Sequence, residues 1–265
     1  MRMMSIASGS SGNCIYIGSD STHILIDTGV SRKRICEGLR SADLSIADID
    51  AVFLTHEHSD HIKAAGIIMR NDEKNFYSTA GTLNRVATDR ATGFIDTDLL
   101  NVIKRDETLT IGDLMIQAFP VSHDAADPVA YTVSCGDTKV GVVTDLGVFD
   151  ETAVTAMTGC RAFLAEANHD VRMLQAGSYP YQLKNRILGS KGHLSNESSG
   201  DLISRILNDS VETVLLGHLS KENNYGPLAL ESVCQTIDDA PCRYKSKDFK
   251  IEVANRDEPS FIIEV

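Results

Sequence analysis

The sequence predicts an α/β protein whose 265 residues, 1–265, form one domain with two strand-rich halves and helices between them. Three observations support this prediction. Short runs rich in β-branched residues, such as Val129–Val133 and Val140–Val143, are separated by turn residues and are typical of strands. Longer stretches between such runs, such as Ser31–Leu39, are typical of helices. A side chain able to bind a metal follows each of six apolar runs, as expected when rigid strands hold loop-borne ligands.

In the first half of the chain, apolar runs predict strands and the stretches between them predict helices. The expected strands are Met3–Ala7, Cys14–Ile17, Ile24–Ile26, Ala51–Leu54 and Phe76–Thr79. The expected helices are Ser31–Leu39, Ile62–Arg70 and Gly81–Asp89. Ser8–Asn13 is rich in small residues and predicts a turn. Arg90–Thr110 has no clear pattern, and no element is assigned there.

From Leu114 onward the pattern becomes more clearly that of a β-rich region. The expected strands are Met115–Val121, Val129–Val133, Val140–Val143, Ala162–Ala165, Val211–Leu216 and Phe261–Val265. The expected helices are Phe149–Met157, Ser198–Leu207 and Ala229–Ile237. No internal repeat, low-complexity segment or linker divides the chain, so one compact domain is the simplest interpretation.

Composition predicts a globular protein of a reducing compartment. Hydrophobic residues make up 42 % of the chain, and no apolar run approaches the ~20 residues that span a membrane. The N-terminal residues turn into Ser and Gly before a signal-peptide core could form, so we expect a cytoplasmic protein. Six cysteines are scattered without a C-x-x-C pair, which predicts mostly buried free thiols and argues against a zinc–thiolate site.

The stretch Thr55–His61, which reads Thr-His-Glu-His-Ser-Asp-His, is the strongest functional signal. It holds three of the eight histidines of the chain, directly behind an expected strand. In a loop that leaves a strand, alternate side chains converge, so His56 and His58 can point at one centre while Asp60 and His61 turn towards a second. Imidazole with carboxylate is the ligand set of zinc, manganese or iron, unlike the oxygen ligands of calcium and magnesium. A solvated polar loop is the alternative interpretation.

Other side chains that can bind a metal follow five further apolar runs. They are Asp27, His123, Asp145, Glu166 and His218. Each of them alone would more often be a structural histidine, a cap or a turn residue. Six such residues, each directly after an apolar run, are hard to explain by chance, so we expect a metal site at one edge of a β framework.

In this order, the residues resemble the motifs of the metallo-β-lactamase superfamily, over nearly the whole chain and without a departure at any motif position. The resemblance implies an αββα sandwich with metals at one edge of the sheets. It implies a first metal held by His56, His58 and His123, a second held by Asp60, His61 and His218, and Asp145 bridging both. Asp27 would accept a hydrogen bond from a ligating histidine and fix its tautomer.

Two divalent ions, zinc or manganese, about 3.5–4 Å apart would lower the pKa of a bridging water so that it attacks as hydroxide. Lactam, thioester, lactone and phosphodiester hydrolysis all fit such a centre, so the ligands alone do not choose the substrate. We expect Asp60, Glu166 and His193 to take part in catalysis.

Glu166 and His193 favour a phosphodiester. Glu166–Asn168 and His193–Ser195 resemble two short motifs of ribonuclease Z, in which a Glu orients a His near the scissile phosphate. A protonated histidine there could protonate the leaving alkoxide or stabilise the pentacovalent state. A polar residue before the expected helix Ser198–Leu207 is the alternative for His193. The chain lacks the length for a protruding tRNA-gripping arm or a β-CASP insert, which disfavours those two nuclease classes.

The net charge of −12 disfavours nucleic acid as a partner, since phosphate binding usually accompanies a basic balance. Metal ligands account for some of these acids, however, and the rest of the charge is uneven. Val171–Ser195 contains no Asp or Glu, and its Gly and Pro residues predict a loop. A basic, aromatic-bearing loop of this kind could grip and stack a nucleic-acid strand, although a solvated surface loop is the alternative. The expected contacts are Lys184, Arg186, Lys191 and Tyr181.

Several short motifs resemble the YycJ/WalJ-type proteins of bacteria. They are Ser8–Cys14, Asp145–Gly147, Glu166–Asp170, Gly192–Asn196 and His218–Asn224. That family is associated with 5′→3′ exonuclease activity on double-stranded DNA and with manganese or zinc, so the resemblance implies a metal-dependent DNA exonuclease. The alternative is a small-molecule thioesterase or lactonase of the same fold, similar to glyoxalase II, whose activity would be indifferent to the loss of His193.

Overall fold

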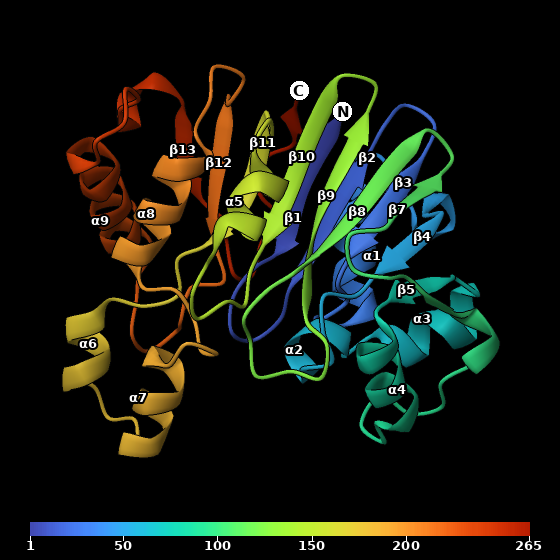
Figure 1. Cartoon of the computed structure of the whole chain (residues 1–265). Coiled ribbons are helices and arrows are strands. Elements are labelled where there is room, and N and C mark those ends of the chain that lie inside the picture. The colour runs from blue at the N-terminus through green and yellow to red at the C-terminus, as the bar shows by residue number, and fades with distance from the viewer.

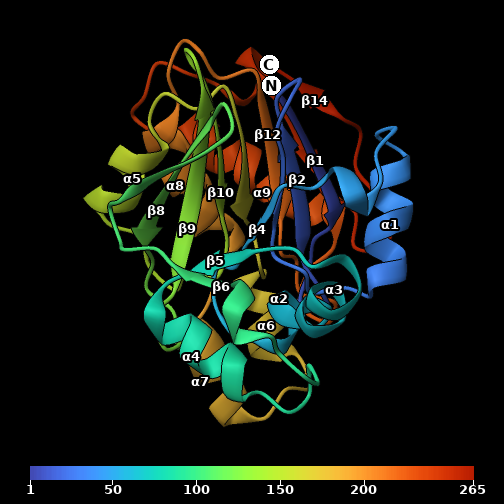
Figure 2. The ribbon, with the colours of Figure 1, turned by 90° about the vertical axis from the view of Figure 1, so that its right-hand side faces the viewer.

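Two sheets of seven strands form the centre of the molecule in the computed structural model, which describes residues 1–265 (Figures 1 and 2). The strands of the first sheet are β1 (Arg2–Ala7), β2 (Cys14–Gly18), β3 (His23–Ile26), β4 (Ala51–Phe53), β5 (Phe76–Ser78), β6 (Leu100–Val102) and β14 (Ile263–Glu264). They lie in the order β14-β1-β2-β3-β4-β5-β6. The strands of the second sheet are β7 (Thr108–Ile111), β8 (Leu114–Pro120), β9 (Val129–Cys135), β10 (Thr138–Val143), β11 (Ala162–Glu166), β12 (Thr213–Gly217) and β13 (Lys250–Val253). They lie in the order β13-β12-β11-β10-β9-β8-β7.

The central strands are apolar on both faces because each face is covered. In β3, Ile24 and Ile26 lie in the core between the two sheets, whereas Leu25 belongs to the core under the helices on the outer side. Successive side chains of a strand point to opposite faces, so a strand buried on both faces is a continuous apolar run. Full burial of each such side chain contributes about 1.5–3 kcal/mol. This explains why the sequence shows apolar runs here rather than an alternating pattern.

Helices cover the outer face of each sheet. The helices α1 (Arg32–Arg40), α3 (Ala65–Asp72) and α4 (Ala80–Thr88) bury side chains against the first sheet. The helices α5 (Glu151–Met157), α8 (Asn196–Ile206) and α9 (Gly226–Asp239) do the same on the second sheet. The predicted αββα sandwich is therefore confirmed. No helix is long and apolar enough to cross a membrane.

The strands that precede the candidate ligands run in one direction within each sheet. β3 is parallel to β4 in the first sheet, and β10, β11 and β12 are parallel in the second. β8 is antiparallel to β9, which is antiparallel to β10, so β8 and β10 share a direction. The short helices α2 (Ser59–Ile62), α6 (Val171–Ala176) and α7 (Tyr181–Leu188) lie at the lower edge of the molecule, opposite the two chain termini (Figures 1 and 2).

One predicted helix is divided in two. The expected helix Ile62–Arg70 starts earlier, inside the histidine motif, as α2, and then breaks before α3. The break follows from Thr28, whose backbone N–H donates to the carbonyl of His61 and whose carbonyl accepts from the N–H of Ala64. These backbone groups are therefore bonded to a neighbouring loop instead of continuing a single helix.

The prediction that Val171–Ser195 is a loop is wrong, because this stretch contains α6 and α7. Asp170 caps α6 by accepting a hydrogen bond from the N–H of Met173. Pro180 is the N-cap residue of α7, and Gly189 lies at its C-cap. The Gly and Pro residues of this stretch therefore mark helix ends rather than an irregular loop.

Three strands without a sequence prediction lie at the sheet edges. They are β6, β7 and β13, and their side chains are mostly half-buried or exposed. An edge strand is covered less completely, so its sequence carries a weaker apolar pattern. The cysteines are all free, as expected, but only Cys14 and Cys160 are fully buried, so the expectation of mostly buried thiols is wrong.

Candidate metal centre

The candidate ligands from both sheets meet at the lower edge of the sandwich. His56 and His58 follow β4, whereas Asp60 and His61 lie on α2. His123 follows β8, Asp145 follows β10, and His218 follows β12. Four overlapping groups have ligand atoms within 4.8 Å of one another; three contain only these side chains, and the fourth joins Asp145 and His218 with Glu166 and His193. The structure thus brings together all seven residues that the sequence suggested as metal ligands.

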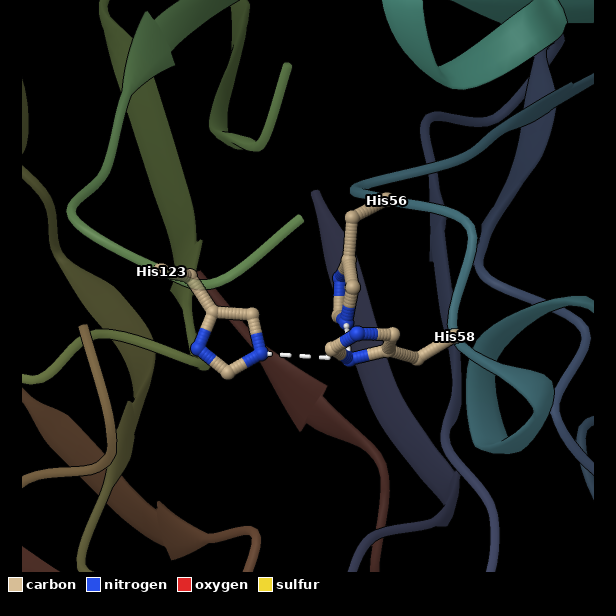
Figure 3. Close-up of side chains that lie close together, drawn as sticks. All are labelled: His56, His58 and His123. Carbon is tan, nitrogen blue, oxygen red and sulfur yellow. Dashed lines mark hydrogen bonds between the residues drawn. The ribbon is translucent and has the colours of Figure 1, made fainter. Parts of the chain in front are cut away.

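His56, His58 and His123 form the first group, with His56 and His58 on one loop and His123 reaching them from the other sheet (Figure 3). The Nδ1 atom of His58 lies 3.0 Å from Nε2 of His56 and 3.2 Å from Nε2 of His123. Neutral imidazole nitrogens that carry lone pairs cannot approach one another favourably unless a proton or a metal lies between them. Three imidazole nitrogens facing one centre are a ligand set that suits zinc.

Asp60, His61 and His218 form the second group, and Asp145 lies beside both groups. The Oδ2 atom of Asp60 is 3.7 Å from Nε2 of His61 and 3.6 Å from Nε2 of His218. Asp145 places Oδ2 3.3 Å from Nε2 of His61 and Oδ1 3.7 Å from Nε2 of His123. Its two oxygens therefore face one histidine of each group, which is the position required of a bridging carboxylate.

Two buried polar atoms at this centre have no hydrogen-bond partner. They are Oδ2 of Asp145 and Nε2 of His218, both in residues that are almost fully buried. A buried polar atom without a partner costs about 1–3 kcal/mol, more when it carries charge. Divalent metal ions bound by these two atoms would remove that cost, so the residues present fit the metals that the fold implies.

Acceptors outside the two groups fix the tautomers of the histidines. Asp27 places Oδ2 2.7 Å from Nδ1 of His61, and the carbonyl of Gly192 lies 3.0 Å from Nδ1 of His123. A carboxylate and a carbonyl only accept, so in both histidines Nδ1 donates and Nε2 remains for a metal. Thr55 in turn holds Asp27, because its N–H and its hydroxyl donate to the two carboxylate oxygens over 2.8 Å each.

Glu166 joins the second group to His193. Its Oε1 atom lies 2.8 Å from Nδ1 of His193 and 2.8 Å from Nδ1 of His218. Its Oε2 atom accepts from the N–H groups of Leu146 and Leu194. Burial would raise the pKa of Glu166, but the two histidines lower this pKa to about 2. The carboxylate is thus charged, and every one of its neighbours is a donor.

The backbone at three of these residues adopts the left-handed conformation that favours glycine. The φ angles are 63° at Asp27 and 55° at His218, each directly after a strand, and 59° at Asp145, two residues beyond the end of β10. Positive φ is uncommon for residues other than glycine, although Asp and His adopt it more often than most. Such conformations persist where the surrounding structure imposes them, and they cluster at functional sites. The sharp turn after the strand aims each side chain at the centre.

Carboxylates control the charge of the buried histidines. Burial would lower the pKa of His218, but Asp145, Asp60 and Glu166 raise it to about 10. Burial would also lower the pKa of His61, yet Asp145, Asp27 and Asp60 raise it well above its usual value. In His56, by contrast, burial and the neighbouring His61 hold the pKa well below its usual range. The carboxylates of the centre thus favour positive charge at the second group, whether protons or metal ions carry it.

The four residues expected to contact nucleic acid do not form a cluster comparable to that of the candidate metal ligands. Arg186 forms two hydrogen bonds with Asp124, of 2.5 and 2.9 Å, and Lys184 donates to the backbone carbonyl of Gln175. Lys191 and Tyr181 are exposed, Tyr181 by 74 %. The charge of Arg186 is therefore satisfied within the protein.

Three further polar residues support the centre; the sequence suggests Asn168 only as a possible phosphate or metal contact or a structural cap, and does not single out Asn13 or Thr55. The Nδ2 atom of Asn13 lies 3.1 Å from Nε2 of His61, and that of Asn168 donates to the carbonyl of His218 over 2.9 Å. Thr55, described above, holds Asp27. Thr55 and Asn168 lie inside the quoted motifs, so their position was visible in the sequence, but their partners were not. No pattern in the turn Ser8–Asn13 indicated that Asn13 reaches His61.

Known proteins are similar to this chain in sequence over most of its length. The profile of the β-lactamase superfamily domain matches residues 22–218. The chain is 37 % identical to the exodeoxyribonuclease YycJ of Bacillus anthracis over 234 residues, which cover 88 % of each chain. It is 38 % identical over 224 residues to the exodeoxyribonuclease WalJ of Streptococcus pneumoniae, covering 84 % of this chain and 83 % of that one.

A solved structure supports the assignment of the fold. The metallo-β-lactamase fold protein YhfI of Bacillus subtilis superimposes with a TM-score of 0.70 at 14 % identity, over 100 % of this chain and 99 % of that chain. At this identity the likeness concerns the fold alone. Together with the family match and the geometry of the centre, it shows that this chain belongs to the β-lactamase superfamily, has the metallo-β-lactamase fold and is a metal-dependent hydrolase.

Proposed function

We propose that this protein hydrolyses phosphodiester bonds of DNA as an exonuclease that uses two divalent metal ions, zinc or manganese. The observation that carries the proposal is the pair of contacts from Oε1 of Glu166 to Nδ1 of His193 and to Nδ1 of His218. One carboxylate thus positions a candidate metal ligand together with a histidine that belongs to neither group of three. The names of the relatives that match most of the chain support the choice of DNA over a small ester.

His56, His58 and His123 would hold one ion, and Asp60, His61 and His218 the other, with Asp145 between them. When bound, such ions lower the pKa of water and neutralise the charge that develops on the attacked phosphate. Asp27, the Gly192 carbonyl and Glu166 keep the ligating imidazoles in the correct tautomer.

His193 is suited to proton transfer to the leaving oxygen. Its Nδ1–H donates to the Glu166 carboxylate, so its Nε2 atom is the one that can carry a proton to substrate. The side chain is 12 % exposed, which keeps it accessible while the ring stays oriented. A deoxyribose alkoxide is a poor leaving group, and a positioned acid typically accelerates such a step by about 10²–10⁴-fold. A thioesterase or lactonase would not need this residue in the same way.

The experiment is a parallel digestion of DNA and RNA, each double- and single-stranded and labelled at the 5′ or 3′ end, with zinc or manganese. We expect release of nucleotides from the 5′ end of duplex DNA, and loss of this activity in His58→Ala, which removes a side chain of the first group. Cleavage from the 3′ end, or of RNA alone, would revise polarity or substrate. Rapid turnover of a thioester or lactone with no cleavage of any nucleic acid would refute the proposal.

A further inference from the structure

Arg256 lies between two loops that reach the metal centre. Its Nη2 atom donates to the carbonyl of Leu219, the residue that follows the candidate ligand His218. Its Nη1 atom contacts the hydroxyls of Ser10 and Ser11, at 3.4 and 3.3 Å, in the turn Ser8–Asn13. The residue follows β13, outside the part of the chain that the superfamily profile covers.

The guanidinium of Arg256 has only neutral acceptors. All of its hydrogen bonds go to the two serine hydroxyls and one backbone carbonyl. Arg34, by contrast, pairs with Asp257, and Arg186 pairs with Asp124. Arg256 is half-buried, and burial lowers its pKa. Asp257 partly offsets this lowering, but no carboxylate forms an ion pair with Arg256, so its guanidinium is available to an anion.

The turn that Arg256 contacts is also in direct contact with two candidate ligands, His218 and His61. Ser8 accepts a hydrogen bond from the N–H of His218 over 2.8 Å. Asn13, at the other end of the turn, bonds to Gly9 and lies 3.1 Å from His61. Arg256 is therefore separated from the two candidate ligands by one short, well-bonded turn.

Residues of this turn line two cavities. One, of about 450 Å³, is lined by Ser10, Ser11, Asp60 and Lys63 among others, so it reaches the second metal-binding group. The other, of about 310 Å³, is lined by Arg256 with Ser8, Ser220, Lys221 and the half-exposed Tyr225. Ser10 and Ser11 thus line a cavity beside Asp60, while Arg256 lines a neighbouring cavity that also has a basic and an aromatic side chain.

Gly9 makes the close approach of Arg256 possible. A Cβ atom at Gly9 would lie 2.7 Å from Nη1 and 3.0 Å from Cζ of Arg256. Any larger residue would push the guanidinium away from the two serines. The serine hydroxyls accept from Arg256, and their own hydrogens stay free to donate to an anion.

We propose that Arg256, with Ser10 and Ser11, binds a phosphate group of the substrate strand other than the one that is hydrolysed. The inference rests on the proposed function, since it assigns a second contact to the same DNA strand. A phosphate oxygen accepts from a guanidinium in a planar, charge-assisted geometry, and the two hydroxyls add neutral donors beside it. The phosphate is either the terminal monoester or an internal diester, because both present the same oxygens.

The test measures binding of a short fluorescent DNA duplex to metal-free protein in chelator, by anisotropy over a range of salt concentrations. The duplex carries either a 5′-phosphate or a 5′-hydroxyl. We expect Arg256→Gln to weaken binding about ten-fold and to reduce the slope of log affinity against log salt by about one, as for the loss of one phosphate contact. Gly9→Ala should weaken binding in the same direction without removing a charge, and Arg256→Lys should restore part of the affinity.

The matched control is Arg243→Gln, which removes the same charge from an exposed arginine paired with Asp209. Binding by this variant should equal that of the wild type. A loss confined to the 5′-phosphorylated duplex would identify the terminal phosphate, and an equal loss on both duplexes an internal one; either supports the site. If Arg256→Gln binds both duplexes with the wild-type affinity and salt slope, the proposal is overturned.

A second measurement distinguishes phosphate binding by Arg256 from a purely structural role, here called a brace, in which Arg256 only holds the two loops together. With metal restored, Arg256→Gln should lower kcat/KM on DNA, mainly through KM, about ten-fold more than on bis(p-nitrophenyl) phosphate, which is too small to span both sites. Equal losses on the two substrates together with lower metal content would indicate a brace and contradict the proposal. Binding that depends on Arg256 in a protein that cleaves neither substrate would support this site while refuting the proposed function.

Discussion

Glu166 provides the sharpest test among single residues, because all four groups around its carboxylate are donors. Glu166→Gln places an amide NH2 where only an acceptor fits. We expect DNA cleavage to fall by about 10²-fold or more, as for loss of a positioned acid, and the free energy of unfolding to fall by about 1–3 kcal/mol. Activity assays and denaturant unfolding measure both. Glu212→Gln, at an exposed carboxylate paired with Arg161, is the control, and wild-type activity in Glu166→Gln would contradict the role given to Glu166.

His61 and His218 couple metal binding to pH. Their pKa values are raised by the surrounding carboxylates, that of His218 to about 10, so in the metal-free protein both rings bind a second proton more readily than a free imidazole does. A metal must displace these protons, so its affinity should increase as the pH rises from about 6 to about 8, with protons released. Calorimetric titration of the metal-free protein in two buffers of different ionisation enthalpy counts the released protons. An affinity independent of pH would contradict this electrostatic description.

At the scale of elements, the contact between the loop after β3 and α2 fixes the second metal-binding group. A Cβ atom at Gly29 would lie 1.6 Å from the carbonyl oxygen of Asp60 and 2.7 Å from the backbone nitrogen of Asn13. Gly29→Ala should therefore displace α2 and reduce the number of bound metal ions, as measured by elemental analysis. Gly226→Ala, where the nearest atom is 3.7 Å away, is the control and should bind metal normally. Full metal content in Gly29→Ala would show that α2 does not depend on this contact.

The elements also show what could be predicted from the sequence. Central strands such as β3 and β10 were recognised because burial on both faces requires continuous apolar runs, whereas the edge strands β6, β7 and β13 lack that constraint. The break between α2 and α3 depends on hydrogen bonds to Thr28, a contact distant in sequence. Such contacts leave no local pattern.

In the candidate site too, local features could be predicted from the sequence, whereas contacts between distant segments could not. The seven proposed ligands stand out because their residue types and their positions after strands are local features. The second contact of Glu166, to His218, and the contact of Asn13 with His61 join distant segments, so only the folded chain shows them. The positive φ angles at Asp27, Asp145 and His218 are likewise consequences of the three-dimensional arrangement.

For the whole molecule, we expect bound metal ions to stabilise the packing of the two sheets against each other. His56 and His58 lie in the loop after β4 of the first sheet and His123 lies after β8 of the second, so an ion bound by all three links the two layers. Metal bound only by the folded state stabilises it, by about 2.7 kcal/mol at a free concentration one hundred times the Kd. We expect chelation to lower the melting temperature and added zinc or manganese to restore it. His58→Ala should show a smaller shift, and an equal shift in this variant would place the stabilising ion elsewhere.

The central claim is that a metal-dependent hydrolase centre acts on DNA with the help of a histidine held by Glu166. The most direct measurement compares wild type with His193→Ala for metal content and for kcat/KM on duplex DNA, beside a thioester substrate. His193 lies close to Asp145, Glu166 and His218, but it is not one of the seven proposed ligands. We therefore predict that the variant keeps its metals, while DNA cleavage falls by about 10²-fold or more. Undiminished DNA cleavage by His193→Ala, or thioester turnover by a wild type that leaves DNA intact, would contradict the account.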